Sequence, residues 1–245
     1  MNAMFPARTV APDFRLVETL HLGAGPLAPA LGAARDRLCA ELVSRGVTPI
    51  LCESWPDLEE LNARYRDSWF PLLPKPSSAP AFWLGLVDGE GEVVATHAVV
   101  LLDCAASSFG ARLADLSALH DPGSGPADEW AFVASEAAHD TRGSVAWIVA
   151  GWTRSDFRGA GLFHRLGELV RLVALARWNP KWVVGLVDPE TVPVWSGRGG
   201  GRRRLEERPG ILYHQNGVGR LPLHLMRWGR HAVYMDLGLC AGPSW

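Results

Sequence analysis

The clearest chemical signal in the sequence is a glycine turn between a strand and a helix. An apolar run of strand length, residues 146–152, is followed by the turn Arg158-Gly159-Ala160-Gly161, and a helical pattern begins directly after it. Glycines allow a tight turn and let a ligand approach the main chain closely. The first N–H groups of a helix have no partner within it, and the helix dipole adds partial positive charge there. This arrangement predicts a site for an anion such as a pyrophosphate, with Arg158 at its mouth.

Two other interpretations of the glycine turn compete with an anion site. Gly-x-Gly alone is a weak signal, and an ordinary strand-to-helix turn also contains it. A dinucleotide-binding fingerprint requires Gly-x-Gly-x-x-Gly, whereas His164 stands at the third glycine position. The turn also comes late in the chain, after antiparallel hairpins, rather than opening a βαβ unit. The pattern therefore disfavours a nucleotide-dependent oxidoreductase.

The elements that position this turn follow from hydrophobic periodicity and turn residues. We expect helices at 27–45, 56–69 and 162–178, strands at 47–52, 81–87, 92–102, 144–152 and 182–187, an irregular stretch at 103–128, a hairpin of 211–215 and 221–228 around Asn216-Gly217, and a further strand at 231–237. Antiparallel hairpins combined with one strand–helix–strand unit predict an α/β (α+β) fold, with a mixed, mostly antiparallel sheet flanked by helices.

The glycine turn resembles the acyl-coenzyme-A-binding motif of the GCN5-related N-acetyltransferase (GNAT) superfamily, an Arg/Gln-x-x-Gly-x-Gly/Ala loop after the fourth strand. The motif here reads Arg158-Gly159-Ala160-Gly161-Leu162-Phe163. Phe163 departs from the family pattern at the last small position, and we expect its side chain to face the core. The order of the elements resembles that of the family over residues 47–237. The specific part of the resemblance is confined to residues 144–187. It implies an acyltransferase domain at 47–245 preceded by an N-terminal helical extension at 1–46.

The resemblance also implies how a cofactor binds. In such enzymes the fourth strand splays from the fifth, and coenzyme A lies in the V-shaped gap. Main-chain groups of Gly151, Trp152 and Thr153 would bond the pantetheine arm, and the amides of residues 158–163 would hold the pyrophosphate. The implied reaction is direct transfer of an acetyl group from acetyl-CoA to an amine, with backbone N–H groups polarising the thioester carbonyl.

A base that removes the amine proton is expected shortly before the fourth strand. Glu136 is our first choice because it lies in a run of small residues that could line a cleft. Glu129, His139 and Asp140 are the other candidates. For each of the four, a polar residue on a solvated strand edge or loop is the competing interpretation.

A tyrosine shortly after the fifth strand is the acid in many relatives, and Tyr213 is the candidate here. It fits this role if residues 211–217 form the end of a helix. If they form a strand that enters the Asn-Gly turn, which the pattern favours, Trp195 takes the place of the tyrosine and the acid is missing or is water. The uncertain acid and base keep open an alternative, a catalytically inactive coenzyme A-binding sensor or interaction module.

Two further features have a structural and a functional interpretation. Tryptophans usually belong to the core, but Trp69, Trp83 and Trp152 could line a pocket for an apolar or aromatic acceptor. The arginine and glycine run at 198–204 could contact nucleic acid or the 3′-phosphate of coenzyme A. Neighbouring glutamates favour a solvated loop for this run.

Composition narrows the function classes. The 245 residues carry 24 Lys+Arg against 26 Asp+Glu, and 48% of them are hydrophobic, which excludes a disordered chain. The near-zero net charge argues against nucleic-acid binding, and no apolar stretch approaches the roughly 20 residues of a membrane helix. The four cysteines are scattered, so we expect no metal site and a reducing, cytoplasmic location. The expected partner is a small-molecule amine, and a homodimer is left open.

Overall fold

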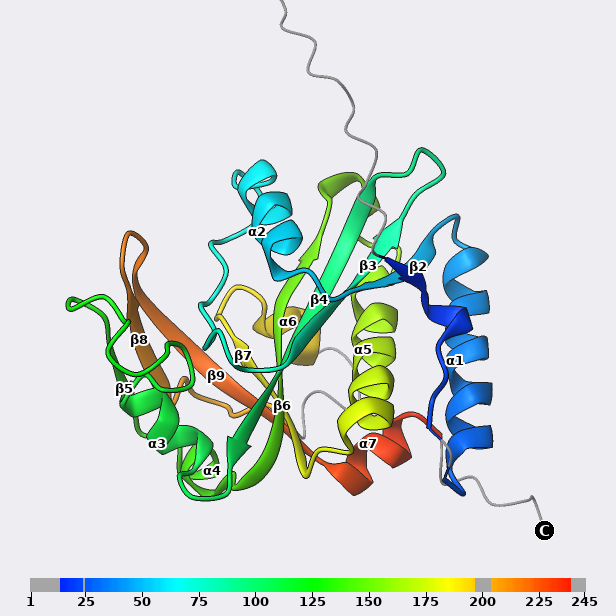
Figure 1. Ribbon diagram of the computed structural model, residues 1–245. Helices are drawn as coiled ribbons and strands as arrows, with labels where there is room; N and C mark the ends of the chain where they lie inside the picture. The colour runs from blue at the N-terminus through cyan, green and yellow to red at the C-terminus, as the bar shows by residue number, and fades with distance from the viewer. Residues whose placement is uncertain (1–13, 24, 197–203, 239–245) are drawn as a thin grey trace, which may run out of the picture.

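The computed structural model of the chain describes residues 14–23, 25–196 and 204–238 (Figure 1). Its strands are β1 (Arg15–Leu16), β2 (Thr48–Cys52), β3 (Ala81–Val87), β4 (Val93–Cys104), β5 (Trp130–Val133), β6 (Gly143–Thr153), β7 (Trp182–Val187), β8 (Ile211–Gln215) and β9 (Gly219–Gly229). Its helices are α1 (Ala28–Val43), α2 (Trp55–Arg64), α3 (Phe109–Ala114), α4 (Glu136–Asp140), α5 (Leu162–Trp178), α6 (Val192–Ser196) and α7 (Arg230–Asp236), with short 3-10 turns at Val17–Thr19 and Ser155–Phe157.

The described strands form one sheet in the order β1-β2-β3-β4-β6-β7-β9-β8-β5. β6 and β7, which α5 connects, run parallel. Every other described pair of neighbours is antiparallel. The predicted fold class, a mixed and mostly antiparallel sheet flanked by helices, is therefore confirmed.

Helices cover both faces of the sheet. Successive side chains of a strand point to opposite faces, and in these strands apolar side chains lie on both. On one face a buried cluster joins α1, α5 and α7 to the strands, with Leu38, Leu166 and Val233 among its members. On the other face a second cluster joins α2, α3 and α4 to the strands, with Leu58 and Phe109 among its members. Figure 1 shows α1 and α5 side by side at one end of the molecule.

The first long helix, α1, lies within the region that the sequence assigns to an N-terminal extension. Its buried residues Leu31, Leu38 and Leu42 recur at helical spacing and belong to the same cluster as the buried side of α5. Within the described part of the chain, α1 therefore packs into the same hydrophobic core as the sheet. The domain boundary at residue 46 stays a prediction.

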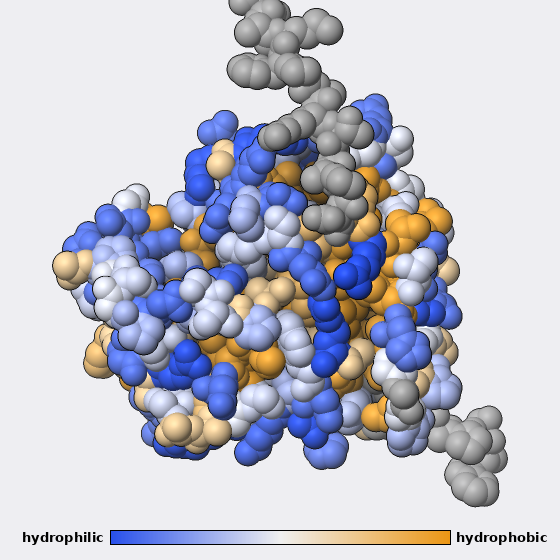
Figure 2. All heavy atoms as spheres, viewed as in Figure 1, coloured by the Kyte–Doolittle hydropathy of each residue, from blue (hydrophilic) through white to orange (hydrophobic). Residues whose placement is uncertain are grey.

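The surface mixes polar and apolar residues. On the face shown in Figure 2, hydrophilic residues predominate over β5, α3 and the β8–β9 hairpin, and hydrophobic residues show between that region and α1. Among the described residues, no helix has the length and apolar character needed to cross a membrane.

Most of the predicted elements near the glycine turn are confirmed. The helix at 162–178 and the strand at 182–187 have the expected bounds, and the hairpins around residues 88–91 and 216–217 are present. These segments carry strong local signals, which are a long amphipathic pattern, branched apolar runs and glycines in the turns.

The predicted strand at 231–237 is wrong, because this segment forms the helix α7. Its buried residues Val233 and Leu237 lie four apart, and the Leu237 N–H donates to the Val233 carbonyl. The indole N–H of Trp228 also donates to the Asp236 carboxylate over 3.1 Å. This segment is too short for its periodicity to separate a helix from a strand.

The helix predicted at 56–69 ends early, at Arg64. The chain then turns, with the Ser68 N–H donating to the Tyr65 carbonyl, and the ring of Trp69 stacks on that of Trp152 at 5.1 Å. A tertiary contact thus ends the helix five residues before its sequence pattern does.

The stretch predicted to be irregular, 103–128, contains the helix α3. Ser108 caps this helix, since its hydroxyl oxygen accepts from the Ala111 N–H, and Phe109 and Leu113 are buried. β5 and α4, at 130–133 and 136–140, were also not predicted. All three elements span six residues or fewer, which is too short for a clear periodic signal.

Candidate functional site

The glycine turn opens outward where α5 begins. Gly159 and Gly161 adopt φ values of +83° and +74°, a left-handed conformation that strains other residues. Gly161 is the N-cap of α5 and provides no capping side chain. No atom lies within 4 Å of the position that a Cβ of Gly159 would occupy. The turn is therefore accessible to a ligand from outside.

The amides of this turn form a row of unpaired donors. None of the N–H groups of residues 159–163 donates a hydrogen bond to any part of the chain that the structure describes. They precede the first internal hydrogen bonds of α5, at the positive end of the helix dipole. This geometry suits a phosphate or pyrophosphate group.

β6 and β7 separate close to this turn. They pair in parallel from Val145 opposite Trp182 to Ile148 opposite Gly185. Beyond Ile148 no described strand pairs with that edge of β6. Ala150 adopts φ +55°, and the pairing of β6 with β4 shifts register nearby. Such a bulge bends a strand, and here it leaves a V-shaped gap between β6 and β7.

A cavity of about 980 Å³ joins the gap and the glycine turn. This volume lies at the upper end of the roughly 300–1,000 Å³ typical of small-molecule sites. Eight of the nine predicted cofactor residues line it, namely Gly151, Trp152, Thr153, Arg158, Gly159, Gly161, Leu162 and Phe163. Ala160, the ninth, lies in the same turn but is not part of the lining. The Thr153 hydroxyl is buried without a hydrogen-bond partner among the described residues.

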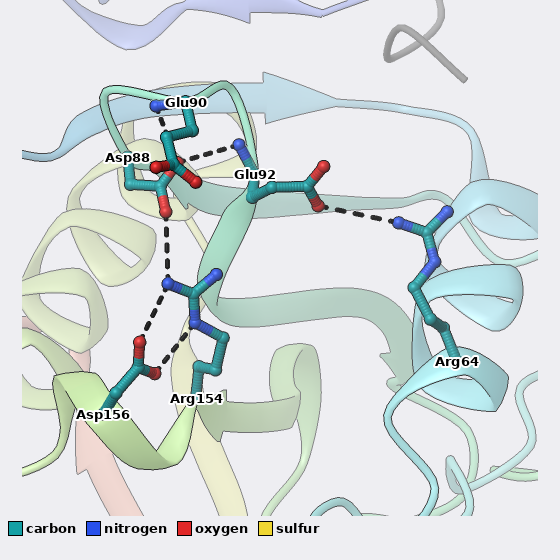
Figure 3. Close-up of polar contacts among 6 residues, drawn as sticks. All are labelled: Arg64, Asp88, Glu90, Glu92, Arg154 and Asp156. Carbon is teal, nitrogen blue, oxygen red and sulfur yellow. Dashed lines mark hydrogen bonds and ion pairs between the residues drawn. The ribbon is translucent and has the colours of Figure 1, made fainter. Parts of the chain in front are cut away.

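Two arginines close to the turn have different roles. Arg154 is held by two carboxylates, Asp88 at 3.2 Å and Asp156 at 2.8 Å (Figure 3). The hydrogen bonds from Arg154 lower the pKa of the Asp156 carboxyl group. Arg158 donates to the Thr153 carbonyl and forms no ion pair with a described residue. Arg154 therefore fixes the loop, and Arg158 keeps a charge available for an anion.

The end of α1 also holds the glycine turn. Arg45 donates a hydrogen bond to the carbonyl of Ala160. Arg165, in the first turn of α5, pairs with Glu41 of α1 at 2.8 Å and with Glu168 at 2.7 Å. The predicted extension therefore contributes to the position of the candidate anion site.

A buried histidine supports the same turn from within the sheet. His97 of β4 is 1% exposed, and its Nε2 lies 3.1 Å from the Phe163 carbonyl oxygen. Because a carbonyl only accepts, Nε2 carries the hydrogen. Burial, together with the charge of Arg171, lowers the pKa of His97 to about 3. A side chain at Gly151 would approach the His97 ring within about 3.1 Å, so glycine leaves room for this histidine.

The expectation that Phe163 faces the core is wrong. Its side chain is only partly buried and lines the cavity, with its ring centroid 4.5 Å from that of His97 and 5.3 Å from that of Trp195. The aromatic residue thus replaces the small residue of the family pattern at the wall of the cavity.

The structure does not bring the predicted catalytic pair to the cavity. Glu136 is exposed at the start of α4, and Tyr213 is buried in β8, where its hydroxyl donates to Glu129 over 2.6 Å. Neither lines the cavity. Burial and this hydrogen bond raise the pKa of Tyr213. Residues 211–215 are a strand, as the pattern favoured, and Trp195 lies on α6 outside the cavity lining.

The other sequence candidates are also accounted for. Glu129 is half-buried, and its side chain, 4% exposed, accepts from His120 and Tyr213, whereas His139 and Asp140 are exposed on α4. Trp69 and Trp152 line the cavity, but Trp83 is buried, with its indole N–H donating to the Ser54 carbonyl. Of the run at 198–204, residues 198–203 lie outside the described residues. Within the described residues, no cluster of three or more His, Cys, Asp or Glu is placed to bind a metal.

Asp188 and Gln215 are polar residues of the cavity lining that sequence reasoning did not single out. Asp188 follows β7 directly and accepts from the N–H and the hydroxyl of Thr191 at 2.9 and 2.5 Å. Its position immediately after a buried strand was a usable signal. Gln215 lies on β8 and meets the cavity beside Leu72, 143 residues away in sequence, a tertiary contact that no local pattern encodes.

Comparisons with known proteins bear on the fold. No family model and no curated protein matches the chain. Among solved structures it is similar to FeeM, an N-acyl amino acid synthase from uncultured soil microbes, at 15% identity and a TM-score of 0.39, covering 91% of this chain and 92% of that one. It is also similar to the GNAT family N-acetyltransferase YhbS from Escherichia coli, at 14% identity and a TM-score of 0.33, covering 95% and 88%. A putative acetyltransferase from Sphaerobacter thermophilus matches at 10% identity and a TM-score of 0.37, covering 74% and 93%.

The element order, the helix α5 after the glycine turn, and the separation of β6 from β7 agree with the GNAT-like layout that the sequence resemblance implies.

Proposed function

We propose that this protein transfers an acyl group from an acyl-CoA thioester, with acetyl-CoA as the donor, to the amine of a small molecule. One observation supports this most strongly. A row of unpaired amides at residues 159–163 and the unpaired edge of β6 open into a single cavity. The first feature suits a pyrophosphate, and the second suits the extended, amide-bearing arm to which the thioester is attached.

The residues of the cavity fit coenzyme A in chemistry and in order. The amides of 159–163 and the guanidinium of Arg158 would bind the pyrophosphate. Main-chain groups of residues 151–153 would bond the pantetheine amides, and the unpartnered Thr153 hydroxyl is available to the same arm. Coenzyme A supplies the activated thioester, and the protein orients its carbonyl carbon toward the acceptor.

In the proposed reaction the acceptor nitrogen attacks the thioester carbonyl carbon. The C–N bond forms, the C–S bond breaks, and the sulfur leaves with the electron pair and takes up a proton from water. The nitrogen loses its proton to a base. Asp188 is our candidate for this base, because it is a carboxylate that lines the cavity at the end of β7. Glu136 as base and Tyr213 as acid stay predictions.

Calorimetry and a thiol-release assay test this function. Acetyl-CoA should bind with measurable heat, and NAD should not. Arg158→Ala should weaken binding about 10-fold, since it removes one charge-assisted contact. Arg208→Ala, on the exposed surface and outside the cavity lining, should have no effect. Absence of binding to acetyl-CoA would overturn the proposal.

A sensor that binds coenzyme A without turnover is the second candidate. It is favoured by the position of Glu136 and Tyr213 outside the cavity. Binding of acetyl-CoA without thiol release across a panel of amines would support the sensor. Turnover with any amine would exclude it.

A further inference from the structure

A group of apolar residues forms a second part of the cavity lining, separate in sequence from the glycine turn. We call this part the acceptor chamber and define it by Trp69, Leu72, Leu73, Leu186, Leu221 and Leu223. These residues come from three separate regions, the loop after α2, the end of β7 and the strand β9. The chamber lies on the α2 face of the sheet, since its residues belong to or pack on the second buried cluster.

The loop that covers the chamber, residues 66–73, is held at several points. Asn62 donates to the Phe70 carbonyl over 2.8 Å, and the indole N–H of Trp152 donates to the Ser68 hydroxyl over 3.3 Å. The stacked rings of Trp69 and Trp152 add an apolar contact. Gln215 ties the loop to β8, because its Nε2 donates to the Leu72 carbonyl over 3.0 Å. The chamber is thus preformed rather than a loose surface groove.

Gln215 leaves one polar atom without a partner at this chamber. Its side chain is 7% exposed and lines the cavity, and its Oε1 is buried with no hydrogen-bond partner among the described residues. The orientation of the amide is fixed, because only the nitrogen can donate to the Leu72 carbonyl. A buried acceptor without a donor is destabilising, because it has lost its hydrogen bonds to water. The chamber therefore favours a ligand that brings an N–H group.

We propose that the acceptor chamber binds an amine with an apolar aromatic or aliphatic body, and that Gln215 Oε1 accepts a hydrogen bond from its N–H. This inference rests on the proposed function and specifies its acceptor. A long acyl chain is the rival occupant. A hydrocarbon chain has no donor, however, and would leave Gln215 Oε1 unpaired, whereas an amine satisfies it. Gln215 is then a specificity residue for the acceptor.

A thiol-release assay with acetyl-CoA tests the acceptor class. 2-Phenylethylamine and hexylamine should give kcat/KM values at least about 10-fold above those of spermidine and lysine, because apolar contacts with the chamber contribute to binding only for the first pair. Octanoyl-CoA should bind no more tightly than acetyl-CoA in calorimetry.

Two matched variants test the role of Gln215. Gln215→Met and Gln215→Glu both lose the bond to Leu72, but only glutamate keeps an acceptor oxygen. Gln215→Met should lower kcat/KM for 2-phenylethylamine about 10–100-fold. Gln215→Glu should retain most of it, and both should bind acetyl-CoA as the wild type does. A thermal melt of each variant shows whether it is folded.

The outcomes separate this inference from the proposed function. If acetyl-CoA does not bind, or binds without thiol release with every amine, the proposed function fails. If it binds but polar amines react as fast as apolar ones, or the two Gln215 variants lose equal activity, the inference alone is overturned. Tighter binding of octanoyl-CoA than of acetyl-CoA also overturns it and assigns the chamber to the acyl chain.

Discussion

The two ends of the cavity are built in different ways. The cofactor end consists of one continuous segment, residues 151–163, in which a strand, a turn and a helix start follow each other. The acceptor chamber combines the loop 66–73, the end of β7 and the β8–β9 hairpin. A binding site made by consecutive residues is set by local conformation, whereas one made by distant segments depends on the whole fold. The two ends should therefore respond differently to substitution.

Asp188, the candidate base, lines the cavity directly after β7, and its substitution should have the largest effect. Asp188→Asn should reduce kcat about 10²–10⁴-fold if this carboxylate is the base. Asparagine can still accept from the Thr191 N–H, so the start of α6 is retained. The control is Asp115→Asn, which changes an exposed carboxylate that accepts from the Ser117 N–H away from the cavity. Equal kcat values for both variants would remove Asp188 from the mechanism.

Gly161→Asp should disable the cofactor end alone. The substitution combines a strained left-handed φ with a negative charge beside the row of amides, and should weaken acetyl-CoA binding about 100-fold in calorimetry. Gly123→Asp is a matched control, because Gly123 has the same φ of +74° in a turn outside the cavity. If Gly123→Asp weakens binding equally, the loss reflects stability rather than the anion site.

The sequence predicted the features made by consecutive residues and missed those that depend on distant segments. The Gly159 and Gly161 turn, α5 and β7 were predicted correctly because each carries its signal in adjacent residues. Gln215 was missed, since its place in the cavity depends on a contact with Leu72, which is distant in sequence. α3 and α4 were missed because five or six residues do not complete two helical turns. Tyr213 looked suitable from residue type, yet Glu129 binds its hydroxyl.

Substitution of His97 tests the hydrogen bond that its Nε2 donates to the Phe163 carbonyl beside the glycine turn. Its pKa, about 3 in the folded protein, is lowered from an ordinary value of 6.5, so the unfolded chain binds the additional proton between these values. The free energy of unfolding should therefore fall as the pH is lowered through this range, by up to about 1.4 kcal/mol per pH unit. His97→Gln keeps a donor for the Phe163 carbonyl and removes the titration.

Urea unfolding of wild type and His97→Gln at pH 6, 5 and 4 checks this expectation. The variant should lose less stability than the wild type over these two pH units, by about 2 kcal/mol. Parallel curves for the two proteins would show that His97 takes up its proton in the folded state as readily as in the unfolded chain.

Tyr213→Phe should produce the smallest effect, confined to stability. The substitution removes one hydrogen bond to the Glu129 carboxylate, which still accepts from His120 and from the Asn216 N–H. The free energy of unfolding should fall by about 1–2 kcal/mol, with kcat unchanged. Tyr234→Phe is the control, since its hydroxyl makes only a 3.4 Å contact at the surface. A loss of kcat in Tyr213→Phe without a loss of stability would restore this tyrosine as the acid and extend the reacting region beyond the cavity into β8.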